Sequence, residues 1–76
     1  MQVNLEVPAK AETAITGYAG AVILLSRGVT YRIECLTSGK LRSATRNGQN
    51  IPVSAWPQTV VKRLARTAAN YFPPRA

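Results

Sequence analysis

Apolar and polar positions alternate from Gln2 to Val7, a period of two that is typical of a half-buried strand, and Pro8 ends the pattern. The continuous apolar run within residues 21–26 instead predicts a central strand that is covered on both faces. Between them, residues 9–20 are ambiguous, because the alanines permit a short helix stopped at Gly17 whereas the threonines also suit a strand. We expect a short helix or an irregular crossing there.

Glycine-containing turns after residue 26 predict a meander of hairpins. Arg27 and Gly28 form a two-residue turn signal, which sets Leu24 opposite Tyr31 on one side of the sheet and Ile23 opposite Arg32 on the other. This register places the large apolar residues on the first side, where the core is expected.

The next turn signal, residues 37–39, fits a three-residue loop with Gly39 in the left-handed position. That loop sets Cys35 opposite Leu41 and pairs the opposite charges of Glu34 and Arg42. Asn47-Gly48 is the strongest two-residue hairpin signal in the chain, and it sets Ala44 beside Ile51. Because Pro52 cannot donate a ladder hydrogen bond, residues 51–53 are predicted to form an edge strand.

The C-terminal third predicts an amphipathic helix. Ser54 is a suitable N-cap, Pro57 is tolerated in a first turn, and Pro73-Pro74 ends the pattern. Helical spacing is kept by the apolar residues Val60, Val61, Leu64, Ala65, Ala68 and Phe72. We therefore expect one α+β domain over residues 1–76: a small antiparallel sheet of four or five strands with one helix packed on one face and a loose tail at 73–76.

The charge distribution makes the chain strongly basic after its first third. Ten Lys and Arg against three Glu give a net charge of +7. Residues 1–26 contribute Lys10 against Glu6 and Glu12, a net charge of −1, and the remainder contributes nine bases against Glu34, a net charge of +8. Such asymmetry favours nucleic acid, an anionic membrane or an acidic protein surface as the partner, the alternative being a merely solubilising surface.

The predicted register gathers cations on the side of the sheet away from the helix, together with Ile23, Leu25, Ile51 and Val53. Partner surfaces often combine an apolar centre with arginine, so this side is the candidate contact site. The candidate binding residues are Arg32, Lys40, Arg42 and Arg46 on the sheet and Lys62, Arg63 and Arg66 on the helix. No sheet aromatic has the spacing of an RNA reader, so backbone contact is favoured over base recognition.

Catalytic and metal-binding signatures are missing from the sequence. The chain has no histidine and no aspartate, and its single cysteine, Cys35, has no partner for a disulfide or a zinc site. We expect Cys35 to be a buried spectator and Trp56 to pack between sheet and helix. The expected protein is therefore not an enzyme, has no cofactor, and is cytoplasmic, with neither a signal peptide nor a membrane-spanning segment.

Two functions follow from this pattern. The favoured one is a small basic module that contacts nucleic-acid backbone through the cationic sheet face. The alternative is a stoichiometric protein-binding inhibitor or adaptor, such as a phage or mobile-element anti-defence (anti-CRISPR-like) protein, that meets an acidic protein surface. Homodimerisation through a free sheet edge or the apolar face is a third hypothesis.

Overall fold

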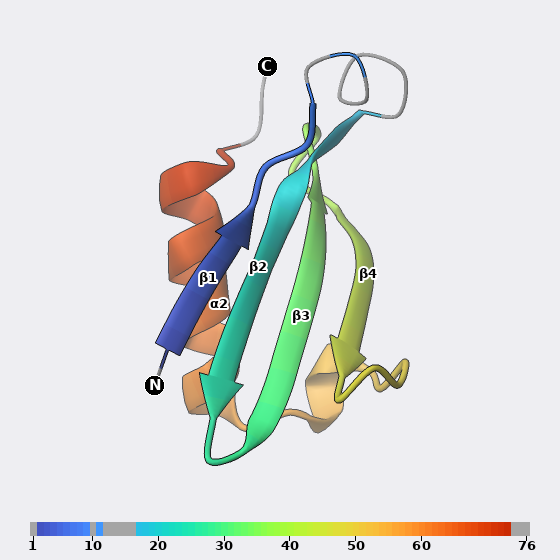
Figure 1. Ribbon diagram of the computed structural model, residues 1–76. Helices are drawn as coiled ribbons and strands as arrows, with labels where there is room; N and C mark the ends of the chain where they lie inside the picture. Colours follow the sequence, from blue (N-terminus) through green and yellow to red (C-terminus); the bar gives the residue numbers. More distant parts are fainter. Residues whose placement is uncertain (1, 10, 12–16, 74–76) are drawn as a thin grey trace.

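The computed structural model of the protein describes residues 2–9, 11 and 17–73. Within these residues, one antiparallel sheet has the order β1-β2-β3-β4, so each strand lies beside its neighbour in sequence (Figure 1). The strands are β1 (Gln2–Glu6), β2 (Tyr18–Ser26), β3 (Val29–Leu36) and β4 (Leu41–Arg46). A 3-10 turn, η1 (Val53–Ala55), and one helix, α2 (Gln58–Tyr71), follow. The predicted α+β class and the C-terminal helix are confirmed.

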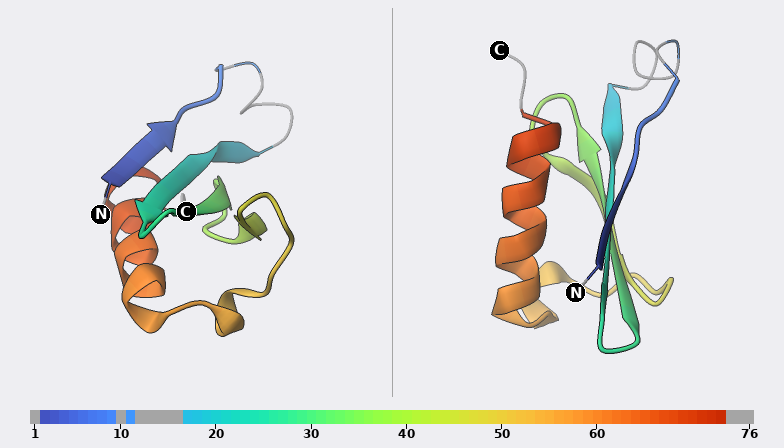
Figure 2. Two further views of the ribbon diagram at one scale, coloured as in Figure 1. Left: turned by 60° about the horizontal axis from the view of Figure 1, so that its bottom comes forward. Right: turned by 60° about the vertical axis from the view of Figure 1, so that its left-hand side comes forward.

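Helix α2 stands against one face of the sheet, as the side view in Figure 2 shows. The side chains of the core come from that face, from α2 and from the segment between them, and they include Val22, Leu24, Tyr31, Ile33, Cys35, Trp56, Val60 and Leu64. Leu24 and Val22 are completely buried. The predicted division of the central strands into a core-facing and an outward-facing side is therefore correct.

The turns have the geometry that their residues favour. Arg27 and Gly28 both have positive φ (51° and 77°), as do Asn47 and Gly48 (52° and 80°). Positive φ at both central residues is the mark of a type I′ turn, one of the two types whose twist matches that of the strands in a two-residue hairpin. The three-residue loop after Leu36 also forms, with a hydrogen bond of 2.9 Å from the Leu36 N–H to the Lys40 carbonyl.

A bulge in β4 changes the predicted register. Cys35 pairs with Leu41 as expected, but Glu34 pairs with Ser43 rather than with Arg42, so Arg42 is the extra residue. Because side chains alternate between faces, a one-residue shift reverses the face of every later residue on the strand. Arg46 accordingly pairs with Tyr31 and belongs to the helix side of the sheet.

The fifth strand predicted at residues 51–53 does not form. After the Asn47-Gly48 turn, pairing is limited to a bridge between Arg46 and Gln49, and Ala44 pairs with Ile33 rather than with Ile51. Pro52 has φ −55° and no N–H, so it cannot extend the ladder. Ile51 and Val53 instead pack against the core.

The helix begins later than predicted. Ser54 lies inside η1, and Pro57 is the residue that precedes the first helical turn. A residue before proline is restricted to extended conformations, and Trp56 has φ −89° and ψ 154°. Pro57 therefore separates η1 from α2, and the predicted N-cap at Ser54 is wrong.

Two predictions fall partly outside the described residues. The short helix or crossing expected at 9–20 includes the undescribed residues 10 and 12–16, and its last part is wrong because β2 already begins at Tyr18; the loose tail includes the undescribed residues 74–76. Of the helices in the part of the chain that is described, none combines the length and apolarity that a membrane crossing requires.

Candidate nucleic-acid interface

Arg32 lies on the sheet face away from the helix, at the centre of an ion-pair network. Its Nη2 atom lies 2.8 Å from Oε2 of Glu6 on β1, and its Nη1 atom lies 3.3 Å from Oε2 of Glu34 on the same strand. The Ser43 hydroxyl of β4 donates a hydrogen bond to the Glu34 carboxylate. One arginine thus connects β1, β3 and β4 and has both described glutamates as partners.

The network holds its members in their charged forms. The hydrogen bond from Ser43 and the neighbouring Arg32 charge lower the pKa of Glu34 against the opposing effect of burial. The hydrogen bond to Glu6 raises the pKa of Arg32. Arg32 is therefore compensated within the sheet, and its charge is less available to a partner than the sequence suggested.

The other three predicted sheet cations are not gathered together. Lys40 lies in the loop before β4, and Arg42 occupies the bulge with its guanidinium 5.5 Å from the centre of the Tyr18 ring, on the face away from the helix. Arg46 lies on the helix side near the opposite end of β4. Of the four sheet cations, Arg32 and Arg42 share the face away from the helix, where both act on Glu34, so the predicted patch of four is not formed on one face.

The cations of the helix form a tighter group. Lys62, Arg63 and Arg66 are all exposed, as predicted, and Arg63 and Arg66 line a cleft between α2 and β1. The cleft has a volume of about 300 Å³. Its other lining residues are Val3, Leu5, Thr67, Asn70 and Tyr71. The Thr67 hydroxyl donates to the Arg63 carbonyl at 2.9 Å, so the exposed polar groups of the cleft are the arginines, Asn70 and Tyr71.

Tyr71 is the residue that the sequence-based prediction missed. Its side chain is 63% exposed at the last turn of α2, and it lines the same cleft as the two arginines. Residues 63, 66, 67, 70 and 71 have the i, i+3, i+4, i+7, i+8 spacing of one helical stripe. That spacing is visible in the sequence, and it could have revealed a cationic and aromatic stripe beside the apolar one.

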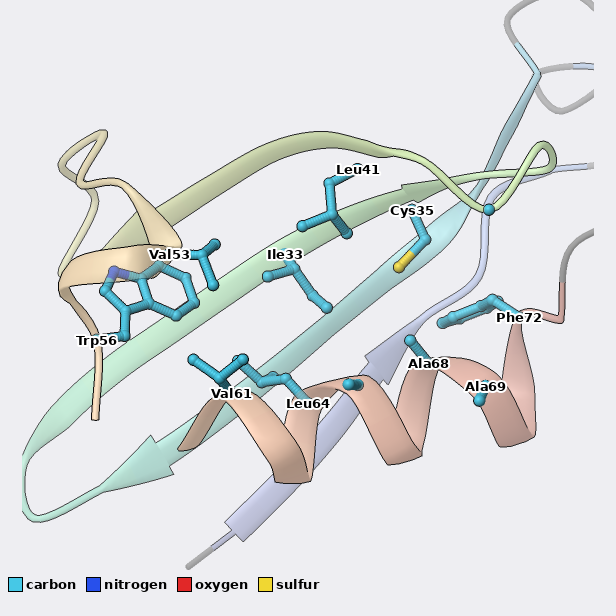
Figure 3. Close-up of a pocket in the computed structure, with 12 residues that line it drawn as sticks. Ile33, Cys35, Leu41, Val53, Trp56, Val61, Leu64, Ala68, Ala69 and Phe72 are labelled. Atoms are coloured by element: carbon cyan, nitrogen blue, oxygen red, sulfur yellow. The ribbon is translucent and has the colours of Figure 1, made fainter. Parts of the chain in front are cut away.

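A second concavity lies on the other side of α2, towards β4 (Figure 3). Its volume is about 310 Å³, and apolar side chains dominate its lining, among them Leu41, Val53, Trp56, Ala65 and Ala69. Figure 3 shows Val53 beside Trp56 and across from Val61 of the helix, with Leu41 on the sheet side of the same concavity. Leu41 is 48% exposed although it is apolar. The helix thus leaves an open apolar groove along the β4 side of the sheet.

Trp56 and Cys35 are both buried, as the sequence predicted. Trp56 is buried and meets the Tyr31 ring edge-on at a centroid distance of 5.1 Å. Cys35 is buried, and this burial raises the pKa of its thiol. No cluster of three or more metal-ligating side chains occurs among the residues that the structure describes.

Comparison with protein-family models, with curated proteins and with solved structures finds no match for this chain.

Proposed function

We propose that this protein is a non-enzymatic module that binds nucleic acid through its phosphate backbone. The observation that supports this proposal most strongly is the imbalance of paired and unpaired charge. In residues 2–9, 11 and 17–73, the ion pairs are both made by Arg32, with Glu6 and with Glu34. The other described bases are exposed and take part in no ion pair there: Arg27, Lys40, Arg42, Arg46, Lys62, Arg63 and Arg66.

Exposed cations without acidic neighbours are suited to phosphates. Each phosphate that such a side chain neutralises releases condensed counterions, which supplies much of the free energy of nonspecific binding. Partners with scattered acidic side chains have a lower and less regular charge density. The helix cations Lys62, Arg63 and Arg66 form the densest group, so we place the centre of the interface on α2 rather than on Arg32 and the sheet face. We expect Lys40, Arg42 and Arg46 to lie outside this centre and to add electrostatic attraction for the phosphates.

The test is a fluorescence anisotropy titration of labelled single-stranded and double-stranded oligonucleotides across a series of salt concentrations. Binding at low salt is expected, with an affinity that falls linearly on a log–log plot as salt is added. The triple variant K62Q/R63Q/R66Q should bind more weakly with a shallower salt dependence. Absence of binding to every DNA and RNA probe at low salt would overturn the proposal.

A second candidate function is stoichiometric binding of a protein partner, an inhibitor or adaptor role. The apolar groove beside β4 favours it, because an exposed concave apolar surface that includes the half-exposed Leu41 resembles the apolar centre of a protein interface. It would be tested by a pull-down from nuclease-treated extract. Ala69→Glu, inside the groove, should abolish recovery of the partner, whereas Gln58→Glu, outside it, should not. Equal recovery with both variants would exclude the groove as the contact.

A further inference from the structure

We infer that the cleft between α2 and β1 is a site for single-stranded nucleic acid, in which Arg63 and Arg66 contact phosphates and the ring of Tyr71 stacks against a base. This inference rests on the proposed function and adds to it a location and a preference for unpaired strands. It also changes the expected mode of binding, from contact with the backbone alone to contact with backbone and base together.

The first support is the composition of the cleft. Two exposed arginines, one exposed amide and one exposed tyrosine line a space of about 300 Å³ beside the apolar side chains of β1. Arginine pairs with phosphate oxygens through a planar fork of donors, and an exposed aromatic ring offers every base a stacking surface. Proteins that bind single strands combine these two features.

The second support is the geometry of the helix. Arg63 and Tyr71 are eight residues apart, so they are separated by about 12 Å along the helix axis. Arg66 and Asn70 lie between them at i+3 and i+7, on the same stripe. The stripe is therefore a linear arrangement, with the two cations near the middle of α2 and the aromatic ring at its end, and an extended strand could follow it along the edge of β1.

The third support is that neither arginine of the cleft has an acidic partner among the described residues. Neither Arg63 nor Arg66 takes part in an ion pair within the described residues, and Val3 and Leu5 contribute no acidic group from β1. The nearest acidic residue of that strand, Glu6, is already paired with Arg32. A phosphate entering the cleft would thus meet positive charge without a competing carboxylate from the lining residues.

A duplex would use this cleft poorly. Its bases are stacked on one another, so Tyr71 could not stack on a base without unpairing it. A duplex would therefore gain the phosphate contacts alone. We expect single-stranded probes to bind more tightly than duplexes of the same sequence.

The experiment compares two double variants that each lose two positive charges. R63Q/R66Q removes the cations of the cleft, and K40Q/R46Q removes two cations beside β4, at the opposite edge of the sheet. The probe is a labelled oligothymidylate of about 12 nucleotides, within the range of known single-strand site sizes. For R63Q/R66Q the slope of log affinity against log salt should fall in magnitude by about 1.4, the value for two lost phosphate contacts on a single strand. For K40Q/R46Q it should change by much less.

The stacking role of Tyr71 is tested by two substitutions, one that removes the aromatic ring and one that keeps it. Tyr71→Ala should weaken binding of oligothymidylate by at least about fivefold, and Tyr71→Phe should retain most of the affinity because it keeps the ring. Both variants should bind a duplex probe with nearly the same affinity as the unaltered protein. Circular dichroism of each variant verifies that the domain is folded, and the exposure of the Tyr71 side chain makes unfolding by either substitution an unexpected result.

The possible outcomes separate the two proposals. If no nucleic acid binds to the unaltered protein, the proposed function fails. If nucleic acid binds but the two double variants lose affinity equally, or Tyr71→Ala binds as well as the unaltered protein, the proposed function is retained but the cleft is not the binding site. If polyglutamate competes as effectively as oligothymidylate, and with the same dependence on Tyr71, the cleft is a site for acidic protein and the inference is overturned.

Discussion

Substitution of Gly20 tests how closely the sheet and the C-terminal end of the helix approach each other. Gly20 has φ +151° and lies at the irregularity near the start of β2. A Cβ atom there would lie 2.5 Å from the carbonyl oxygen of Glu6 and 2.5 Å from Cε1 of the Phe72 ring. Both distances are far below van der Waals contact. Gly20→Ala must therefore displace β1, the Phe72 ring, or both.

The expected cost has two parts. Overpacking a close contact costs about 1–3 kcal/mol, and holding a non-glycine residue in an unfavourable backbone region costs about 1–3 kcal/mol more. The sum, about 2–6 kcal/mol, compares with about 4–11 kcal/mol for the whole stability of a domain of this length. Gly28→Ala is the matched control. Gly28 also has positive φ, but a Cβ atom there would meet nothing within 4 Å, so only the backbone cost of about 1–2 kcal/mol applies.

The assay is urea unfolding followed by the fluorescence of Trp56, which is buried in the native state. Gly20→Ala should lower the unfolding free energy by clearly more than Gly28→Ala does. In the background of Phe72→Ala, the cost of Gly20→Ala should shrink, because the ring that the new methyl group would meet is gone. Equal costs for the two glycines, or an unchanged cost in the Phe72→Ala background, would refute the close approach described here.

Three further predictions concern the core, the charged network and the thiol. Leu24→Ala, at a fully buried position, should lower the unfolding free energy by about 2–5 kcal/mol in urea titrations, and an effect as small as that of the partly exposed Leu25→Ala would contradict the core assignment. Because the pKa of Glu34 is lowered in the folded state, the stabilisation from its carboxylate is present above the ordinary value of 4.5 and is lost as the pH falls through the folded pKa. Glu34→Gln should therefore reduce the difference between the urea midpoints measured at about pH 6 and about pH 3. An unchanged difference would show that this carboxylate does not contribute to the loss of stability in acid. Cys35 should react with a thiol-specific disulfide reagent at neutral pH only after unfolding, because the thiol is buried and its pKa is raised. Rapid labelling of the native protein would contradict the burial of this thiol.

The predictable part of this fold is local in origin. The hairpin turns at Arg27-Gly28 and Asn47-Gly48 follow from residues that tolerate positive φ, and the turn at 27–28 fixes which residues of β2 and β3 face the core. The helix follows from apolar spacing. Each of these signals lies within a few residues of the structure that it determines.

The unpredicted part depends on interactions between distant residues. Nothing in residues 40–46 marks Arg42 as a bulge, yet that single insertion moves Arg46 to the other side of the sheet. The pairing of Arg32 with Glu6 joins residues 26 positions apart, so the sequence could not show that the central cation of the proposed patch was compensated. The cleft with Arg63, Arg66 and Tyr71 needs the position of β1 beside α2, although the stripe itself is visible in the helical spacing.

The salt dependence of nucleic-acid binding tests the central claim most directly. Anisotropy titrations of the unaltered protein with single-stranded oligonucleotide should show binding at low salt and a linear fall of log affinity with log salt concentration. The magnitude of the slope should decrease when Arg63 and Arg66 are replaced by glutamine. No binding at low salt, or an affinity that does not change with salt, would contradict the account.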